Sequence, residues 1–252
     1  MARELEGDAD IAAVAALLAD PARARMLQAL DNRALPAGVL AAEAGIAAST
    51  ASGHLSRLLE SRFVTVETHG RHRYYRLADP AIAELLETLA RLAPTRPIRS
   101  LRGGTRAEAL RRARSCYDHL AGRLGTSLMA ALLERGWLDG GDGLFDLDAH
   151  GSDRLCARGR DVDYRLTELG RSGLHAFGIE VDALPGKRRL IRYCVDWTEQ
   201  RHHLSGGLGA ALLAQMVALD WLRPGPTNRA LAVTERGREA LEREFGIVDA
   251  GR

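Results

Sequence analysis

Residues 47–77 read AASTASGHLSRLLESRFVTVETHGRHRYYRL and change their hydrophobic period partway along. Leu55, Leu58 and Leu59 recur at helical spacing, which predicts a helix from about residue 48 to residue 61. The segments 63–66 and 74–77 are short apolar and aromatic runs that are typical of strands. A basic turn joins these two runs, so this stretch predicts a helix followed by a β-hairpin.

Further helices are predicted on both sides of this stretch. An apolar stripe that begins at Ile11 indicates a first amphipathic helix. Asp20 and Pro21 predict the start of a second helix, because aspartate caps helices and proline fits their first position. A third, short helix is predicted for residues 36–44, with Gly45 as a left-handed stop. Downstream, residues 79–92 predict one more helix.

The predicted helix at residues 48–61 suits the major groove of DNA, because its outward face carries small and polar side chains. The basic turn suits the phosphate backbone or the minor groove. Three helices followed by a basic hairpin form a winged helix-turn-helix, so we expect this domain to bind double-stranded DNA. The candidate contacts are Ser49, Thr50, Ser52, His54, Ser56 and Arg57 on the helix, and Arg71, His72 and Arg73 on the hairpin.

Structural alternatives exist for these residues. The serines and Thr50 could be solvated helix surface, and Arg57 could pair with Glu43 or Glu60. The histidines of the turn could make no specific contact.

Residues 11–92 resemble the ArsR/SmtB family of bacterial repressors. The resemblance is carried by LADPARARMLQAL at residues 18–30, by residues 47–60, and by the hairpin at residues 64–77. It covers about a third of the chain, and its helix, turn and wing occur in the family's order. The resemblance implies a homodimer formed through the first and last helices of this domain. It also implies repression that an effector relieves or alters.

The chain departs from the family pattern at four positions of the DNA-binding region. Ala47 stands where the family usually has a capping serine, Ala48 where it has a groove-facing glutamine, Gly53 where histidine is common, and Arg62 where glycine is common. The base preference of relatives therefore cannot be transferred. The family's two best-known metal sites are missing, because residues 36–44 contain no cysteine and residues 80–92 contain no histidine.

A duplicated segment forms the second half of the chain. HLAGRLG at residues 119–125 matches HLSGGLG at residues 203–209, and both matches extend without a gap to a Trp-Leu pair. Each copy predicts a helix, a strand pair and a helix, which makes it a winged-helix-like repeat, so two similar lobes should pack together. The glycines of the repeat suggest close helix packing. The predicted division is a winged-helix domain at 1–94, a basic linker at 95–105, and a duplicated effector or oligomerisation domain at 106–252, with repeats at about 106–180 and 187–248.

Cysteine, histidine and aspartate residues occupy matching places in the two copies. Thiolate, imidazole and carboxylate groups are ligands for a zinc-like ion. If these segments are helical, Cys116 shares a face with His119, and Cys194 shares one with His202. The candidate metal ligands are Cys116, Asp118, His119, Cys194, Asp196, His202 and His203. The alternatives are structural roles for all of them, or a redox or small-molecule effector.

Composition predicts a mainly α-helical chain with small β-hairpins, rich in alanine and leucine. The chain has 252 residues, a formal net charge of +2, and three cysteines, an odd number that favours a reducing compartment. Cys156 lies in a predicted surface loop. An acidic N-terminus without a signal-peptide pattern, and no apolar run long enough to span a bilayer, predict a cytoplasmic, nucleoid-associated protein that contacts no membrane.

The sequence favours a regulator over an enzyme. No Ser-His-Asp, Cys-His or paired-carboxylate motif is readable. The glycines after Ser205 follow no predicted strand, which makes them a poor nucleotide-binding loop. Two alternatives to the repressor remain: a metal- or redox-sensing repressor that uses Cys116 and Cys194, and a protein-interaction module with weak DNA binding.

Overall fold

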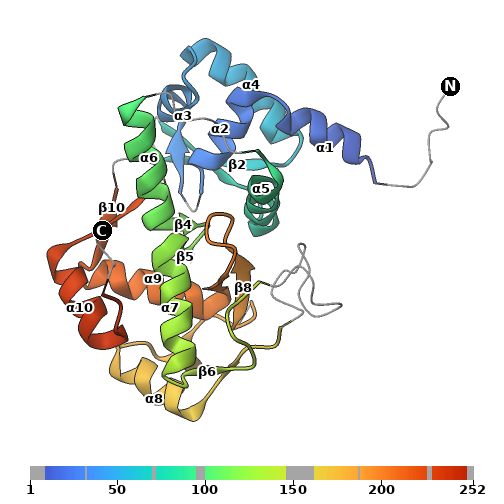
Figure 1. The fold of residues 1–252 in the computed structure, drawn as a ribbon. Helices are drawn as coiled ribbons and strands as arrows, with labels where there is room; N and C mark the ends of the chain where they lie inside the picture. The colour runs from blue at the N-terminus through green and yellow to red at the C-terminus, as the bar shows by residue number, and fades with distance from the viewer. Residues whose placement is uncertain are drawn as a thin grey trace. The chain divides into compact units, whose positions relative to one another are not determined.

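The computed structural model describes residues 9–31, 33–69, 72–94, 100–145, 162–186, 188–225 and 229–248 (Figure 1). The chain divides into two compact units, Met1–Ala83 and Glu84–Arg252. Both are mainly helical with short antiparallel hairpins, which confirms the predicted fold class. None of the helices in these ranges combines the length and the apolar character needed to cross a bilayer.

The first unit begins with helices at the predicted places, namely α1 (Ile11–Leu18), α2 (Pro21–Ala29), α3 (Ala37–Ala44) and α4 (Ala48–Glu60). Asp20 caps α2, because its carboxylate accepts hydrogen bonds from the backbone N–H groups of Ala22 and Arg23, both at 2.9 Å. Gly45 ends α3 with a φ of 70°, as its predicted role as a left-handed stop requires. The turn between α3 and α4 is therefore fixed by its own sequence.

A three-stranded antiparallel sheet completes this unit. Its strands are β1 (Leu35–Pro36), β2 (Val64–His69) and β3 (His72–Leu77), in the order β1-β3-β2. The hairpin register places Val64 opposite Leu77 and His69 opposite His72. The sequence did not predict β1, because a strand of two residues is too short to show a period.

The core of the first unit lies between its helices. Met26, Leu40 and Leu55 are fully or almost fully buried and come from three different helices. Two arginines of α2 satisfy the carbonyl groups at the ends of neighbouring helices. Nε of Arg23 donates to the Leu17 oxygen at 2.6 Å, and Nη1 of Arg25 donates to the Ala44 oxygen at 2.9 Å. The helix-turn-helix is thus held by both apolar packing and helix capping.

The second unit begins within α5 (Pro80–Leu92) and continues with α6 (Leu101–Arg112). Helix α6 starts inside the range that we predicted as a linker. The first copy of the repeat then contains β4 (Arg114–Cys116), β5 (His119–Ala121), α7 (Gly122–Glu134), β6 (Leu138–Asp139), β7 (Arg165–Leu166) and α8 (Glu168–Ala176). After a short 3-10 helix, η1 (Val181–Ala183), the second copy contains β8 (Arg192–Val195), β9 (His202–Ser205), α9 (Gly206–Ala218), β10 (Leu222–Pro224), β11 (Leu231–Val233) and α10 (Glu235–Phe245).

Each copy therefore consists of a hairpin, a helix, a second hairpin and a second helix. The predicted order of helix, strand pair and helix is present, but the leading hairpin was missed. Strands β4 and β9 are three and four residues long and β9 is buried along its whole length. Strands as short as these show no clear alternation of polar and apolar residues. The expectation that no strand precedes the glycines after Ser205 was wrong, since β9 ends at Ser205 itself.

The two copies pack closely through the repeated glycines. A Cβ atom on Gly125 of α7 would lie 2.5 Å from the Leu120 oxygen and 3.5 Å from Cβ of His203 in the other copy. A Cβ atom on Gly209 of α9 would lie 2.6 Å from the Leu204 oxygen and 3.1 Å from Cβ of His119. Each helix thus lies against a histidine of the opposite copy, and the predicted close packing of the glycines is confirmed.

Candidate functional site

Helix α4 has a buried apolar face and an exposed polar face. Ala51, Leu55 and Leu58 are buried and fix the rotation of the helix. The predicted DNA contacts on the opposite face that are exposed are Ser49, Thr50, Ser52, Ser56 and Arg57. No bulky apolar side chain interrupts this set, so α4 can approach base edges closely.

His54 differs from the other predicted contacts on α4. Its side chain is only 17% exposed, and its Nδ1 lies 3.7 Å from Oδ1 of Asp20, the cap of α2. The backbone N–H of Arg23 and the nearby His54 hold the pKa of the Asp20 carboxyl below its usual range. We therefore interpret His54 as a residue that joins α4 to the start of α2.

Arg57 and Arg73 are the described arginines of the predicted interface. In the part of the chain that the structure describes, Arg57 is exposed and has no carboxylate partner, so it forms the predicted ion pair with neither Glu43 nor Glu60. Arg73 is exposed on β3, with its guanidinium carbon 5.7 Å from the centre of the Tyr75 ring. Arg71 and the side chain of His72 lie outside the described residues.

Two of the departures from the ArsR/SmtB pattern, Ala47 and Arg62, have local structural consequences, whereas Gly53 has none. Ala47 is the N-cap of α4 and makes no side-chain cap hydrogen bond. A Cβ atom on Gly53 would meet no atom within 4 Å, so nothing in this unit requires a glycine there. Arg62 has a φ of 57°, the left-handed conformation that glycine adopts most easily. Helix α4 is therefore bounded by two unfavourable residues.

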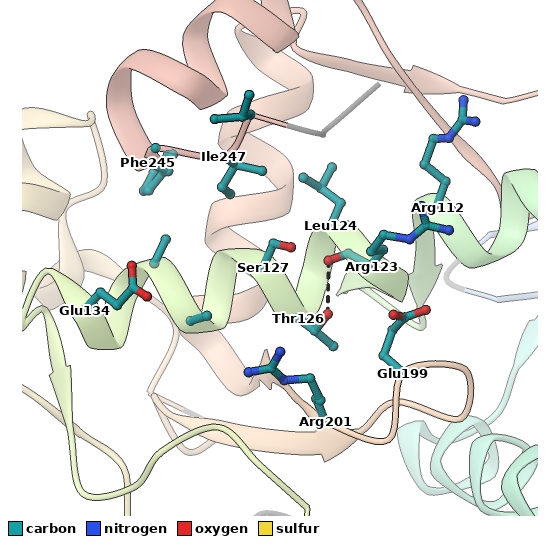
Figure 2. Close-up of a pocket in the computed structure, with 14 residues that line it drawn as sticks. Arg112, Arg123, Leu124, Thr126, Ser127, Glu134, Glu199, Arg201, Phe245 and Ile247 are labelled. Atoms are coloured by element: carbon teal, nitrogen blue, oxygen red, sulfur yellow. Dashed lines mark hydrogen bonds between the residues drawn. The ribbon is translucent and has the colours of Figure 1, made fainter. Parts of the chain in front are cut away.

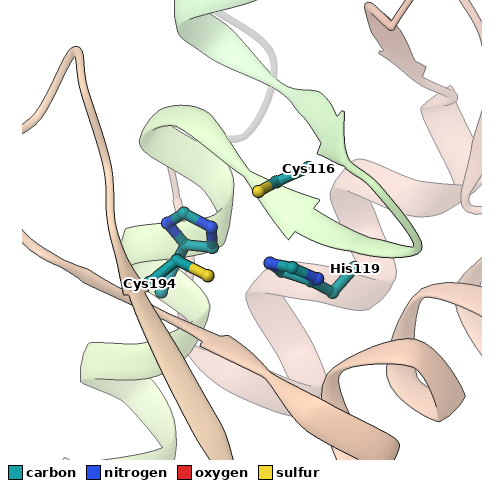
Figure 3. A group of neighbouring side chains, drawn as sticks. Cys116, His119 and Cys194 are labelled. Carbon is teal, nitrogen blue, oxygen red and sulfur yellow. The ribbon is translucent and has the colours of Figure 1, made fainter. Parts of the chain in front are cut away.

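A compact cluster of two cysteines and two histidines lies in the second unit (Figure 3). Cys116 and His119 face each other across the β4–β5 hairpin, and Cys194 faces His203 across the β8–β9 hairpin. One potential ligand atom from each of the four residues lies within 4.8 Å of all the others. Cys116, His119 and His203 are buried and Cys194 is partly exposed. Each copy of the repeat contributes one thiol and one imidazole.

The expected helical arrangement of these residues was wrong. The pairs meet across hairpins, because strand neighbours on one face lie directly opposite each other. His202 is turned away from the cluster, and its Nδ1 lies 2.7 Å from the Tyr164 hydroxyl. Asp118 and Asp196 lie beside the cluster's histidines and are not among the four clustered residues. Cys156 lies outside the described residues.

The ionisation of the cluster is strongly coupled. A hydrogen bond from Cys116, together with the nearby His119, holds the pKa of the Cys194 thiol well below its usual range. The same hydrogen bond, together with burial, raises the pKa of the Cys116 thiol. Burial alone would lower the pKa of His119, but the Cys194 charge and Asp118 raise it to about 9. The cluster thus already favours a thiolate next to an imidazolium.

A buried ion pair joins the two copies next to this cluster. Nη2 of Arg114 donates to Oδ2 of Asp196 at 2.9 Å, and both side chains are fully buried. Sequence reasoning missed Arg114. The repeat itself carried a signal for it, because Arg114 precedes Cys116 by two residues as Arg192 precedes Cys194.

The second unit also contains a pocket of about 410 Å³ beside α7 (Figure 2). Arg112, Arg123 and Arg201 line it together with Glu134 and Glu199. Phe245 and Ile247 give part of its wall an apolar character. The lining therefore combines charged groups of both signs with an apolar wall.

Known proteins are similar in sequence to all or part of this chain. Residues 18–67 match the family model described as "Helix-turn-helix domain". The HTH-type transcriptional regulator YdfF of Bacillus subtilis (strain 168) is 38% identical over 240 residues, which cover 94% of this chain and 98% of YdfF. The HTH-type transcriptional regulator CmtR of Mycobacterium tuberculosis is 40% identical over 75 residues, which cover 30% of this chain and 64% of CmtR.

Among solved structures, the homodimeric winged helix-turn-helix DNA-binding domain of Mb0332 from Mycobacterium bovis is 27% identical, with a TM-score of 0.31. The match covers 35% of this chain and 86% of that one. The helix-turn-helix match and the near full-length likeness to YdfF confirm the prediction of a helix-turn-helix transcriptional regulator. The chain belongs to the family of HTH-type transcriptional regulators that includes YdfF.

Proposed function

We propose that this regulator is a repressor that binds operator DNA as a homodimer and responds to an effector through its second unit. The observation that carries the DNA-binding part is the exposed polar face of α4, which precedes a basic hairpin in the same unit. A helix with this face fits the major groove, and the hairpin then reaches the neighbouring backbone.

Helix α4 and the β2–β3 hairpin have different tasks in DNA binding. The short side chains of Ser49, Thr50, Ser52 and Ser56 reach base edges or phosphates at close range, and Arg57 suits a guanine or a phosphate. On the wing, Arg71, His72 and Arg73 neutralise phosphates, which sets affinity and its salt dependence. His54 acts behind the helix through Asp20.

The dimer proposal rests on the composition and exposure of α1. This helix reads IAAVAALL, yet none of its residues is buried within the chain. Ile11 is 76% exposed, and Leu92 at the end of α5 is 66% exposed. Burial of an exposed apolar helix against a partner chain is favourable, because it removes apolar surface from water. We therefore propose that α1 and α5 form the dimer interface.

A chain of contacts supports a link between the second unit and the dimer helix α5. Arg229 donates through Nη2 to the Ser115 oxygen at 3.0 Å and pairs with Glu87 of α5. Ser115 immediately precedes Cys116 of the Cys–His cluster. A ligand that moves β4 would thereby act on α5.

Further proposals concern the division of the chain into parts and its place in the cell. We propose a DNA-binding and dimerisation part at 1–94, a connector at 95–105 and an effector part at 106–252. The protein would act in the cytoplasm at the nucleoid and would have no catalytic role. The Cys–His cluster and the pocket beside α7 are candidate places for an effector.

The experiment is selection of DNA from a pool of random duplexes by the full-length protein, followed by sequencing. A dimeric repressor is expected to enrich an inverted repeat whose half-sites lie about 10 base pairs apart, one turn of the double helix. Enrichment of a single half-site would reject the dimer. A selected pool that is indistinguishable from the starting pool would reject operator binding and favour the protein-interaction alternative.

A further inference from the structure

We propose that Cys116, His119, Cys194 and His203 together bind one zinc-type divalent metal ion, and that this ion ties the two copies of the repeat together. The inference goes beyond the proposed function, because it concerns the second unit alone and does not depend on DNA binding. It rests on the positions, burial and partners of the four side chains.

The four side chains have the number and chemistry of a closed tetrahedral site. Zinc prefers thiolate and imidazole ligands, and a Cys₂His₂ set is among its common structural sites. With metal–sulfur bonds of about 2.3 Å and metal–nitrogen bonds of about 2.0 Å, the ligand atoms of a tetrahedron lie about 3.3–3.8 Å apart. The four ligand atoms here lie within 4.8 Å of one another, so small side-chain rotations bring them to that separation.

Three ring nitrogens of the cluster's histidines are buried next to the cysteine thiols, without an oxygen or nitrogen hydrogen-bond partner among the described residues. They are Nε2 of His119 and both ring nitrogens of His203. His203 is 1% exposed. Leaving a buried polar atom unsatisfied costs free energy, and native proteins seldom do so without a reason. A bound metal ion would satisfy Nε2 of both histidines.

A carboxylate lies near Nδ1 of each histidine, as is common for histidines that bind a metal ion. Oδ1 of Asp118 lies 3.4 Å from Nδ1 of His119, and Oδ2 of Asp196 lies 3.5 Å from Nδ1 of His203. A carboxylate hydrogen-bonded to Nδ1, as at His119, keeps that nitrogen protonated and leaves Nε2 free to bind the ion. At His203 the Asp196 carboxylate lies at ion-pair distance from Nδ1. We therefore assign these two aspartates a positioning role outside the ligand set.

The carboxylates are themselves held in place by arginines. Asp196 pairs with the buried Arg114, and Asp118 pairs with Arg188. Asp196 also accepts a hydrogen bond from the backbone N–H of Gly122 at 2.7 Å, which joins it to the start of α7. The ligand positions are thus fixed by groups from both copies.

The donor set selects the kind of ion. Two thiolates neutralise the charge of a divalent cation in a buried place, where an uncompensated charge would be costly. Sulfur ligands favour zinc or cobalt over magnesium or calcium, which prefer oxygen. Partial exposure of Cys194 provides an entry path to the otherwise buried site. Because each copy provides one cysteine and one histidine, the ion would cross-link two hairpins that share no strand pairing.

The test uses the untagged full-length protein, with metal content measured by mass spectrometry and Zn²⁺ or Co²⁺ added as chlorides. We expect one zinc ion per chain. Replacement by Co²⁺ should produce the visible absorption of a tetrahedral site and a near-ultraviolet thiolate-to-metal band. Mg²⁺ should not compete. Removal of the ion by a chelator should lower the thermal midpoint of unfolding, and re-addition of Zn²⁺ should restore it.

Variants separate the ligands from their neighbours. Loss of a ligand should weaken Zn²⁺ binding by about 100-fold or more in each of the variants Cys116→Ser, Cys194→Ser and His203→Asn. Asp118→Asn should weaken it by about 10–100-fold, the range for residues that hydrogen-bond to a metal ligand. His202→Asn is the matched control, because this buried neighbour of His203 faces Tyr164, and its Zn²⁺ affinity should equal that of the wild type.

Several outcomes would overturn the proposal. These are wild-type protein without saturable Zn²⁺ or Co²⁺ binding, a Co²⁺ spectrum without a thiolate band, retention of the ion by both cysteine variants, or a Cys116–Cys194 disulfide in freshly purified protein. An unchanged unfolding midpoint after metal removal would reject the cross-linking role. The wild-type cobalt spectrum decides the matter even if a variant fails to fold.

Discussion

Arg114 and Asp196 form a fully buried ion pair that joins the two copies of the repeat. Nη2 of Arg114 lies 2.9 Å from Oδ2 of Asp196, and neither side chain is exposed. The carboxylate also accepts hydrogen bonds from the backbone of Gly122 and from Thr198, at 2.7 Å to each donor. The charge of Asp196 is therefore compensated from both copies.

Replacement of Arg114 by Met should strongly destabilise the protein, because it leaves the Asp196 carboxylate buried without its countercharge. The expected loss in the free energy of unfolding is about 3–5 kcal/mol. Urea unfolding followed by circular dichroism measures it. Arg165→Ala is the control, since its pair with Asp163 is 73% and 75% exposed and should contribute little. Equal stabilities of the two variants would show that the buried pair is dispensable.

Gly209→Ala should destabilise the second unit. The added Cβ would lie 2.6 Å from the Leu204 oxygen and 3.1 Å from Cβ of His119, so the backbone or the other copy must shift. Overpacking of this kind costs about 1–3 kcal/mol. The free energy of unfolding checks the effect, and Gly125→Ala should behave alike because Gly125 faces the Leu120 oxygen and His203 in the same way. A neutral effect at both positions would contradict the close packing of the two copies.

Gly53→Ala should have the opposite effect and stabilise α4. The new methyl group meets no atom within 4 Å, and alanine is favoured over glycine in helices by about 0.5–1 kcal/mol. Thermal unfolding of the full chain provides the measurement. A lower midpoint would show that Gly53 has a structural role that its open surroundings do not reveal.

Ala47→Ser should also stabilise α4, by supplying the missing cap. A serine at this position can accept from the free N–H groups of the first turn, which is worth about 1 kcal/mol. The same unfolding assay applies, and Ala48→Ser, one residue inside the helix, is the matched control that should give no gain. If both substitutions had the same effect, capping would not be the cause.

The Asp20 cap should give a pH-dependent contribution to stability. Because the folded pKa of Asp20 lies below its unfolded value, its contribution is present above the unfolded pKa and is lost as pH falls through the folded pKa. At neutral pH, Asp20→Ala should cost about 1 kcal/mol. The difference from the wild type should shrink below about pH 4, the ordinary range of the aspartate carboxyl. A difference independent of pH would exclude the ionised cap.

The sequence predicted the parts of the fold that depend on local signals. Asp20, Pro21 and Gly45 mark helix ends by their own chemistry, so α2 and α3 begin and end close to the predicted places. Strands β1, β4 and β9 were missed, because segments of two to four residues are too short to show a period. Strand β1 also pairs with β3, which is distant in the chain, whereas β4 and β9 each pair with a neighbouring strand.

The arrangement of the Cys–His cluster could likewise be predicted only in part from the sequence. The repeat aligned Cys116 with Cys194 and His119 with His203, which placed both pairs among the candidate metal ligands. Sequence spacing alone could not decide between a helix and a hairpin. For that reason it did not distinguish His203 from His202, whose side chain points toward Tyr164.

The most direct test of DNA binding by the wing is the salt dependence of affinity for a duplex obtained by selection, measured by fluorescence anisotropy with full-length protein. Arg71→Ala with Arg73→Ala should weaken binding and reduce the slope of log affinity against log salt by about 2, because two phosphates are no longer neutralised. Arg165→Ala with Arg171→Ala removes the same charge from the second unit and should leave the slope unchanged. A wing variant with the affinity and slope of the wild type would contradict the account.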